Sequence, residues 1–318
     1  MIDWKDEYKR RLRSIDEAVA TVKSNDDIVV AMCASEPQGL MGALHKRAGS
    51  VENVKVFSCL TLKPYDFFMK PEMKGIFELN SWFHTAGIRE VVKKGYGTAT
   101  YVPNMLHRAA TDRMYARRPD VFMGACTPPD RHGNVYLAMS LTYEKDVLEN
   151  AGRVILEVNE KMPRVFGDTL VNVRDVDIFV ENTQEVPEMP GAQPGEVDML
   201  IGSHIAELVE DGSTIQLGIG GIPNAVALSL KDKRDLGVHT EMFVDSMMDL
   251  YEMGVLTNRK KGFMKDRAVT TFCMGSKRLY DWIDDNPVVE FHRGKWVNDP
   301  CVVRQNTRMV SINTCRGG

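Results

Sequence analysis

The amino-acid sequence predicts an α/β protein made of two related, open α/β domains. A chain of 318 residues exceeds the size that one hydrophobic core usually serves, so two domains are expected. Apolar, strand-like runs alternate with helical stretches, which is typical of a largely parallel sheet. A pattern of helix, strand, small-residue turn and proline-led helix also occurs twice at a constant spacing, which aligns Pro37 with Pro223, Val29 with Ile215 and Leu40 with Val226.

The composition is that of a globular protein. Hydrophobic residues make up 43% of the chain and charged residues 26%, with a formal net charge of −4. This balance gives no general affinity for nucleic acid or for an anionic membrane. No apolar run approaches the roughly 20 residues that span a bilayer, and the N-terminus lacks the apolar core of a signal peptide. We therefore expect a cytoplasmic protein.

The cysteines and histidines predict neither disulfides nor a metal site. The six cysteines include no CxxC pair, and the seven histidines show no HxxxH or HxH spacing. In a chain of this size without a secretion signal, we expect reduced thiols that mostly pack in the interior. Metal ligands usually occur at such short spacings, so no metal is expected.

The first half of the chain reads as helices and strands in alternation. Apolar residues at three- and four-residue steps predict an amphipathic helix over residues 2–23. The β-branched run Ile28–Val30 predicts a strand, with Ser35 as the cap and Pro37 in the first turn of the next helix. A helix is also expected at 105–117, and "PPDRHGN" (128–134) predicts a turn that makes one hairpin in the otherwise parallel pattern. Further strands are expected at 54–59, 97–103, 120–125, 134–139 and 153–159.

The segment "PEMPGAQP" (187–194) predicts the domain boundary. Its three prolines and a glycine cannot continue a helix or a central strand. We therefore expect one domain over residues 1–186 and the other over 195–318. The second domain should begin with a helix at 196–210.

The stretch "QLGIGGIPNAVALSL" (216–230) predicts a strand, a glycine turn and a helix that opens at Pro223. Gly218, Gly220 and Gly221 carry no side chain, so their backbone N–H groups can face a ligand at a helix N-terminus that favours negative charge. The pattern is neither a full dinucleotide fingerprint nor a phosphate loop. A tight strand-to-helix turn without a ligand is an equally acceptable interpretation.

Glu241 follows Gly218 after one helix and one further strand. In a βαβ unit the two strand ends open at the same edge of the sheet, where ligands of open α/β sheets bind. Glu241 is therefore either a working carboxylate that faces the glycine turn or a charge at a helix entry. Asp245 and Asp249 fit the second interpretation better because they lie on the following helix.

An ordered set of motifs resembles the acetyl-CoA hydrolase/transferase family. In the second half these are "LGIGGIPNAV", "HTEMFVDSMMDLYEMGVLTN", "TFCMGSKRLYDWIDDNP", "VNDP" and "MVSINT"; in the first half "SEPQGLMGAL" and "NEKMPRVFGDTLVNVRDVD" agree. The branch that the chain resembles most is the 4-hydroxybutyrate and butyrate:acetate CoA-transferases. The similarity covers nearly the whole chain and implies the CoA-transferase type of α/β domain.

The resemblance implies roles for particular residues. Glu241 matches the family's nucleophile, which forms a glutamyl-CoA thioester. The segment Gly218, Ile219, Gly220, Gly221 and Ile222 is expected to lie against CoA and the reacting carbonyl. Asn298 in "VNDP" matches an asparagine that positions the intermediate, although an Asx turn before Pro300 would also explain it. His239 is expected to line the pocket at most, since a carboxylate nucleophile needs no base.

The resemblance also implies the reaction and its participants. We expect CoA exchange between short-chain carboxylates such as acetate, butyrate and 4-hydroxybutyrate, with CoA as a substrate, no cofactor, and a homodimer. An acyl-CoA hydrolase and an inactive, truncated ligand-binding relative are the alternatives. Family members continue beyond "VSINT" to a second glycine-rich loop, so the second domain is expected to be incomplete and the activity of the chain reduced.

Overall fold

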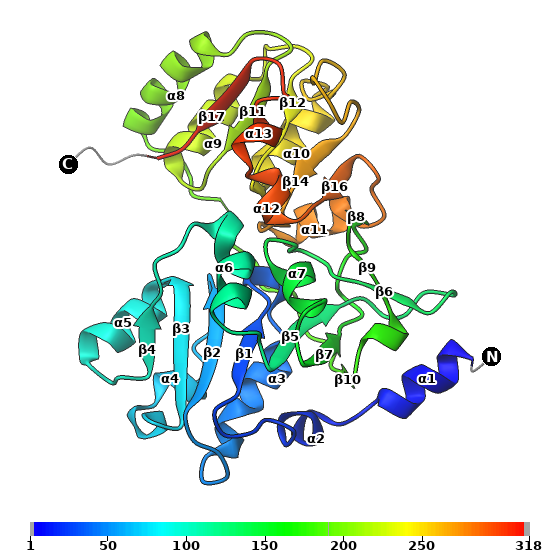
Figure 1. Cartoon of the computed structure of the whole chain (residues 1–318). Coiled ribbons are helices and arrows are strands. Elements are labelled where there is room, and N and C mark those ends of the chain that lie inside the picture. Colours follow the sequence, from blue (N-terminus) through cyan, green and yellow to red (C-terminus); the bar gives the residue numbers. More distant parts are fainter. Residues whose placement is uncertain (1–2, 190, 315–318) are drawn as a thin grey trace. The chain divides into compact units, whose positions relative to one another are not determined.

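The computed structural model describes residues 3–189 and 191–314 and separates the chain into two compact units (Figure 1). Unit 1 contains the chain up to Met162 together with Thr169–Pro187. Unit 2 contains Pro163–Asp168 and the chain from Glu188 onward. The chain thus changes unit at the start of the proline-rich segment 187–194. The sequence-based ranges place Pro163–Asp168 in the first domain, whereas the structure packs this stretch with unit 2.

The sheet of unit 1 is parallel throughout. Within the described residues it has seven strands, in the order β10-β7-β5-β1-β2-β3-β4, and every neighbouring pair is parallel. The central strands are buried along their whole length, which is why they read as continuous apolar runs rather than as alternating ones. The strand bounds are β1 (Asp27–Val30), β2 (Val54–Cys59), β3 (Phe77–Phe83), β4 (Ala99–Tyr101), β5 (Val121–Cys126), β7 (Arg153–Val158) and β10 (Ile178–Glu181).

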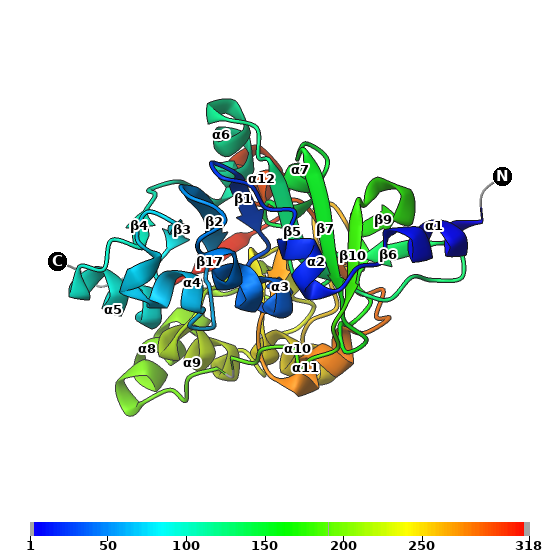
Figure 2. The same cartoon turned by 90° about the horizontal axis from the view of Figure 1, so that it is seen from below.

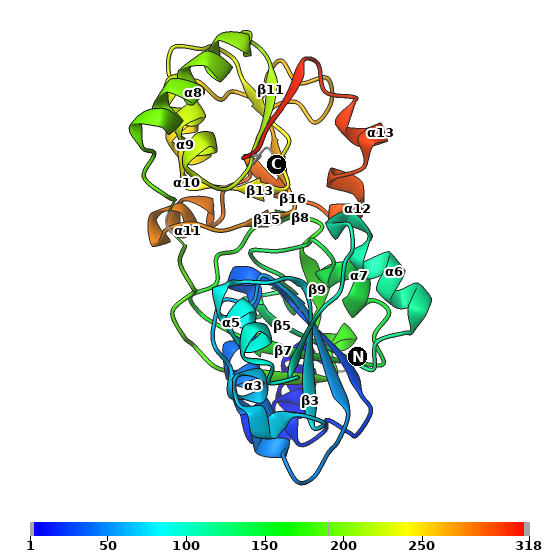
Figure 3. The ribbon, with the colours of Figure 1, turned by 90° about the vertical axis from the view of Figure 1, so that its left-hand side faces the viewer.

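Helices cover both faces of this sheet. Figures 2 and 3 show α3 (Gln38–Ala43) and α5 (Ala86–Lys94) on one face, and α6 (Ala109–Ala116) and α7 (Glu144–Leu148) on the other. The core lies largely between the sheet and the helices α3, α4 (Asp66–Met69) and α5. Its members include Val30, Leu40, Val56, Phe67, Leu79 and Ile88, all fully buried.

The structure corrects three predicted helix bounds. The helix predicted at 2–23 is two helices, α1 (Trp4–Arg11) and α2 (Ile15–Val19), because Ser14 and Glu17 form a capping box that starts a new helix. Ser35 does not cap α3: it lies in a 3₁₀ turn, and Pro37 occupies the cap position. The helix predicted at 105–117 begins as a 3₁₀ turn and continues as α6.

The predicted hairpin turn exists but leaves the main sheet parallel. Asp130 Oδ1 accepts hydrogen bonds from the backbone N–H groups of His132 (2.8 Å) and Asn134 (2.9 Å), which closes the turn. The strand that follows, β6 (Asn134–Tyr136), pairs antiparallel with β9 (Leu170–Asn172) in a separate two-stranded sheet. An isolated antiparallel bridge between Cys126 and Leu137 links this segment to the main sheet.

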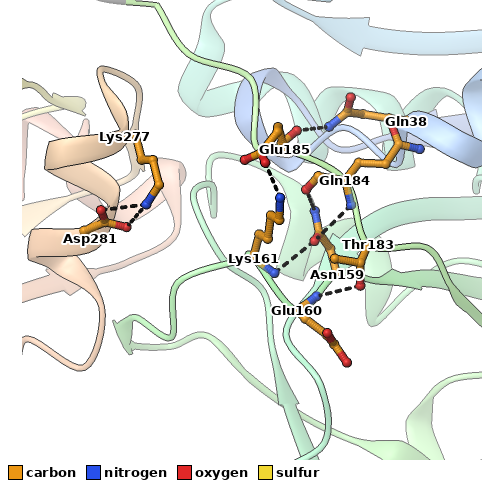
Figure 4. A network of polar contacts seen from close by, with 9 residues as sticks. All are labelled: Gln38, Asn159, Glu160, Lys161, Thr183, Gln184, Glu185, Lys277 and Asp281. Atoms are coloured by element: carbon orange, nitrogen blue, oxygen red, sulfur yellow. Dashed lines mark hydrogen bonds and ion pairs between the residues drawn. The ribbon is translucent and has the colours of Figure 1, made fainter.

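A polar network fixes the segment by which the chain leaves unit 1 (Figure 4). Asn159, directly after β7, donates from Nδ2 to Gln184 O at 2.9 Å and accepts at Oδ1 from Lys161 N at 3.0 Å. Lys161 forms an ion pair with Glu185, and Gln38 Nε2 donates to Glu185 O at 3.0 Å. The exit segment is therefore held to the carboxyl end of β7 and to α3. The same view shows a pair within unit 2, Lys277 with Asp281 at 2.6 Å.

The described part of unit 2 contains three short parallel sheets. They are β12-β11-β17, β13-β15 and β14-β16-β8. The bridge His239–Val269 and the pair Met242–Phe272 have the same register, so one pairing resumes after a gap at positions 240 and 241. The bounds are β8 (Phe166–Gly167), β11 (Thr214–Leu217), β12 (Gly237–Val238), β13 (Met242–Phe243), β14 (Ala268–Thr270), β15 (Phe272–Cys273), β16 (Val289–Phe291) and β17 (Met309–Ile312).

Helices also lie on both sides of these sheets. Figure 3 shows α8 and α9 on one side of β11, and α12 and α13 on the other. The arrangement α8–β11–α9 repeats α2–β1–α3 of unit 1, as the sequence repeat predicts. The predicted α/β class with parallel sheets is confirmed. The helices are α8 (Glu196–Leu208), α9 (Gly221–Ser229), α10 (Asp245–Glu252), α11 (Lys277–Ile283), α12 (Gly294–Val297) and α13 (Pro300–Val303).

Candidate active site

Glu241 lies in the gap between β12 and β13, on a backbone fixed by two N–H donors. Its carbonyl oxygen accepts hydrogen bonds from Thr271 N and Phe272 N, each at 3.1 Å. The Thr270 hydroxyl, which is fully buried, lies 3.1 Å from the same oxygen and 2.9 Å from Phe272 O, so two acceptors share its one hydrogen. The residue that bears the carboxylate therefore belongs to the sheet scaffold rather than to a loop.

The Glu241 carboxylate contacts Asn298. Asn298 Nδ2 donates to Glu241 Oε2 at 2.5 Å, and both residues are half-buried. Asn298 is the C-cap of α12, and its backbone N–H donates to Gly294 O at 3.0 Å. The Asx turn before Pro300 is made by Asp299, whose Oδ1 accepts from Cys301 N at 2.7 Å. The amide of Asn298 is thus directed at Glu241 rather than used in that turn.

His239 is buried rather than exposed to a pocket. It is 1% exposed, and its Nε2 lies 2.7 Å from Val297 O. Because a carbonyl only accepts, Nε2 carries the hydrogen. Burial lowers the pKa of His239 to about 4, so the ring is neutral at neutral pH. Its Nδ1 has no partner among the described residues, and the expectation that His239 lines a pocket is not met.

Lys261 anchors the other end of this segment. It is 1% exposed, and Nζ donates to Val238 O at 2.9 Å and to Arg267 O at 2.7 Å. Burial lowers the pKa of the Lys261 amine to about 7. The amine therefore joins the end of β12 to the start of β14, next to the gap that holds Glu241.

The glycine turn has the geometry that its sequence requires. Gly218 would place a Cβ 2.4 Å from Asn313 Oδ1, and Gly220 has φ +128°, which L side chains rarely adopt. Ile219 is half exposed. Gly221 and Ile222 are the first two residues of α9, so their N–H groups belong to the helix turn that lacks internal acceptors.

The strand pairing stops short of the glycine turn and Glu241. β11 pairs with β12 through Thr214–Gly237 and Ile215–Val238. The same step along the sequence, taken from Gly218, leads to Glu241, but β12 ends at Val238, so the pairing itself stops before these two residues.

A hollow of about 500 Å³ adjoins the glycine turn. Its lining residues include Gly218, Ile219, Gly220, Met242 and Val244 but neither Glu241 nor Asn298. The structure thus brings Glu241 and Asn298 into contact and sets the glycine turn beside a separate hollow.

Comparison with known proteins finds similarity in both parts of the chain. It matches the acetyl-CoA hydrolase/transferase N-terminal domain over residues 2–190 and the C-terminal domain of that family over 275–317. The 4-hydroxybutyrate coenzyme A transferase of Clostridium kluyveri is 36% identical over 99% of this chain and 73% of its own length. The chain belongs to the acetyl-CoA hydrolase/transferase family. The predicted family is therefore confirmed.

Two further similarities agree with this membership. The butyryl-CoA:acetate CoA-transferase of Anaerostipes caccae is 34% identical over 98% of this chain and 71% of its own length. The crystal structure of RipA from Yersinia pestis superposes with a TM-score of 0.92 at 34% identity, over 98% of this chain and 75% of that one. The likeness is therefore not confined to one of the two units.

The part of the chain that the structure describes contains no helix long and apolar enough to cross a membrane. Among the same residues, no group of three or more His, Cys, Asp or Glu side chains could hold a metal ion. Four of the cysteines, Cys33, Cys59, Cys126 and Cys273, are buried and Cys301 is exposed; Cys315 lies outside the described residues.

Sequence reasoning did not find Thr270 or Lys261, and it assigned no structural role to His239. All three act on backbone carbonyls, and a carbonyl leaves no trace in the sequence of the residue that bears it. The sequence offered one signal of these roles: Lys261 and His239 lie in stretches that also contain apolar residues. A polar side chain that is buried in such a stretch needs a hydrogen-bond partner.

Proposed function

We propose that this chain is an acyl-CoA:carboxylate CoA-transferase for short-chain acids such as 4-hydroxybutyrate, butyrate and acetate. The contact between Asn298 Nδ2 and Glu241 Oε2 supports this most directly. The chain belongs to the acetyl-CoA hydrolase/transferase family, and two relatives similar to it are named as CoA-transferases for these acids. A carboxylate held by an amide donor on a fixed backbone is oriented before any substrate binds.

Glu241 is the proposed nucleophile. One carboxylate oxygen attacks the thioester carbonyl of the acyl-CoA, the carbon–sulfur bond breaks, and CoA leaves as a thiolate. The products are a mixed anhydride between Glu241 and the acyl group, and free CoA thiolate. The thiolate then attacks Cδ of Glu241, the anhydride carbon–oxygen bond breaks, and the first acid leaves as its carboxylate. The enzyme then carries CoA as a glutamyl thioester.

The second acid reverses these steps. Its carboxylate attacks Cδ of the glutamyl thioester, releases the thiolate and forms a new anhydride. The thiolate then attacks the acyl carbonyl of that anhydride, which frees the Glu241 carboxylate and the new acyl-CoA. Each thioester that is broken is replaced by another, so the exchange needs neither ATP nor a metal ion.

Asn298 and the glycine turn have complementary proposed roles. The Asn298 amide donates to the Glu241 oxygen that remains a carbonyl in the thioester, where it stabilises the negative charge of the tetrahedral intermediates that form at Cδ of Glu241. The N–H groups of the turn from Gly218 to Ile222, at the start of α9, contact CoA. A homodimer and a cytoplasmic location complete the proposal, and sedimentation of the purified chain tests the first of these.

The test is to trap the thioester. The protein is incubated with acetyl-CoA, treated with borohydride and digested; the expected result is a reduced side chain at Glu241 and at no other carboxylate. Glu241→Gln should abolish both the label and CoA transfer. The matched control is Glu252→Gln, which makes the same change on an exposed residue of α10 that pairs with Arg278.

The acceptor dependence separates the alternatives. CoA transfer that requires added butyrate supports the proposal. Release of CoA at the same rate without any acid would identify a hydrolase, in which water attacks the thioester. Binding of acyl-CoA without label or release would leave a ligand-binding relative without catalysis.

A further inference from the structure

Two hydrogen bonds join the same two short segments of unit 2. One segment contains His239 and Glu241, and the other contains Val297 and Asn298. His239 Nε2 bonds to Val297 O at 2.7 Å, and Asn298 Nδ2 bonds to Glu241 Oε2. The first bond is fully buried and the second half-buried. The buried bond thus joins the residue two positions before the proposed nucleophile to the residue directly before its amide donor.

The His239 ring is held rigidly. Its centroid lies 5.7 Å from that of Phe263 and 6.2 Å from that of Trp296, so aromatic rings adjoin it from two elements. The residue before it is fixed as well, because Lys261 Nζ donates to Val238 O at 2.9 Å. A ring with this little freedom holds its N–H in one place.

The acceptor of that N–H is the peptide group from which Asn298 extends. Val297 O belongs to the peptide bond between Val297 and Asn298, at the last turn of α12. This helix has only four residues, and the N–H of the same peptide group, on Asn298, donates to Gly294 O at 3.0 Å. The peptide is thus held at its N–H by α12 and at its C=O by His239. The bond from His239 therefore completes the fixation of the peptide, and with it the direction of the Asn298 side chain.

We infer that His239 is a positioning residue for the reaction: by binding Val297 O it keeps the Asn298 amide against the Glu241 carboxylate. His239 does not touch substrate in this role, and it acts as neither acid nor base. The inference rests on the proposed CoA transfer and deepens it, because it names the group that holds the amide donor in place.

The decisive experiment compares two substitutions of nearly equal shape. His239→Gln keeps an N–H donor at the end of a side chain that can reach Val297 O, whereas His239→Met fills similar space without a donor. A misplacement near 1 Å costs on the order of 100-fold in rate, so His239→Met should lower kcat roughly 10- to 100-fold. His239→Gln should stay within about threefold of the wild type, and the KM for acyl-CoA should change little in both.

A double-mutant cycle shows whether the effect passes through Asn298. In an Asn298→Ala background there is no amide left to position, so adding His239→Met should change kcat by less than about twofold. The matched control is His292→Met, since the His292 ring lies 5.0 Å from that of Trp296 but bonds to Glu290. It should leave kcat unchanged.

The outcomes separate this inference from the proposed function. The inference is overturned if His239→Met is as active as the wild type, or if it lowers kcat by the same factor with and without Asn298. If His239→Met does not fold, the glutamine variant decides: activity near the wild type supports the inference, and a folded variant with a loss above tenfold overturns it. A wild-type chain without transfer or label refutes the proposed function instead. In that case hydrogen exchange of the Asn298 side-chain amide still tests the positioning, and it should be faster in His239→Met only.

Discussion

Shortening the Glu241 side chain by one methylene tests whether its position, rather than its charge alone, matters for catalysis. Glu241→Asp keeps a carboxylate but withdraws it by about 1.5 Å, the length of one carbon–carbon bond. The backbone cannot follow, because the backbone N–H groups of Thr271 and Phe272 both donate to the carbonyl of residue 241. The 2.5 Å contact with Asn298 would therefore open to about 4 Å, beyond hydrogen-bond range.

Two independent estimates give the size of the effect. A hydrogen bond to a charged group contributes about 1.5–3 kcal/mol. A misplacement near 1 Å costs on the order of 100-fold, which corresponds to about 2.7 kcal/mol. We therefore expect kcat for transfer from acetyl-CoA to butyrate to fall about 100-fold, with a KM for acetyl-CoA close to that of the wild type.

The control for this substitution is Glu252→Asp, the same change at an exposed carboxylate on α10. It should leave kcat within error of the wild type, since exposed ion pairs such as that with Arg278 contribute little. A loss of less than about threefold in Glu241→Asp would refute the reasoning, because it would mean that the carboxylate acts without the fixed contact to Asn298.

Three other predictions concern the residues around the site and helix packing within each unit. Thr270→Val removes the hydroxyl that Glu241 O and Phe272 O share but keeps the shape, so kcat should fall by up to about fivefold, as expected for a net hydrogen bond near 1 kcal/mol; an unchanged kcat with a lower Tm would give Thr270 a purely structural role. Lys261, whose pKa burial lowers to about 7, binds fewer protons folded than unfolded between pH 7 and about 10.4. The unfolding free energy of the wild type should therefore rise with pH across that window, and that of Lys261→Met should not. The same pH dependence in the two proteins would contradict this prediction. Gly202→Ala places a Cβ 2.7 Å from the Ala225 backbone where α8 meets α9 and should cost about 1–3 kcal/mol, whereas Gly42→Ala, on α3 with nothing within 4 Å, should be neutral or stabilising by up to about 1 kcal/mol; urea unfolding measures both, and equal effects would refute the packing argument.

The sequence was most informative where chain spacing determines geometry. The strand, turn and helix predicted at 216–230 are present as β11, the glycine turn and α9, whereas the prediction that Gly218 and Glu241 lie at one edge stays a prediction. The buried strands β1 and β5 were predictable because strands covered on both faces are continuous apolar runs. The break between α1 and α2 was also readable, since Ser14 and Glu17 have the spacing of a capping box, but the apolar periodicity over 2–23 masked it.

The contacts that complete the site were not predictable from local patterns. Glu241 and Asn298 lie far apart in the sequence, and only the family resemblance connected them before the structure was known. Thr270, Lys261 and His239 act through backbone carbonyls, and the position of a carbonyl depends on strand pairing rather than on residue type. Their roles therefore required the coordinates of the folded chain.

The number of residues between β12 and β13 matters for the site, because the gap at positions 240 and 241 separates these strands. The pairing keeps one register on both sides of the gap, and successive side chains of an extended segment point to opposite faces. Met242 and Val244 line the hollow beside the glycine turn, while Glu241 contacts Asn298. Loss or gain of a single position between Val238 and Met242 would exchange these faces, turning an apolar side chain toward Asn298 and the carboxylate toward the hollow. A one-residue insertion or deletion in this segment should therefore abolish the contact between Glu241 and Asn298.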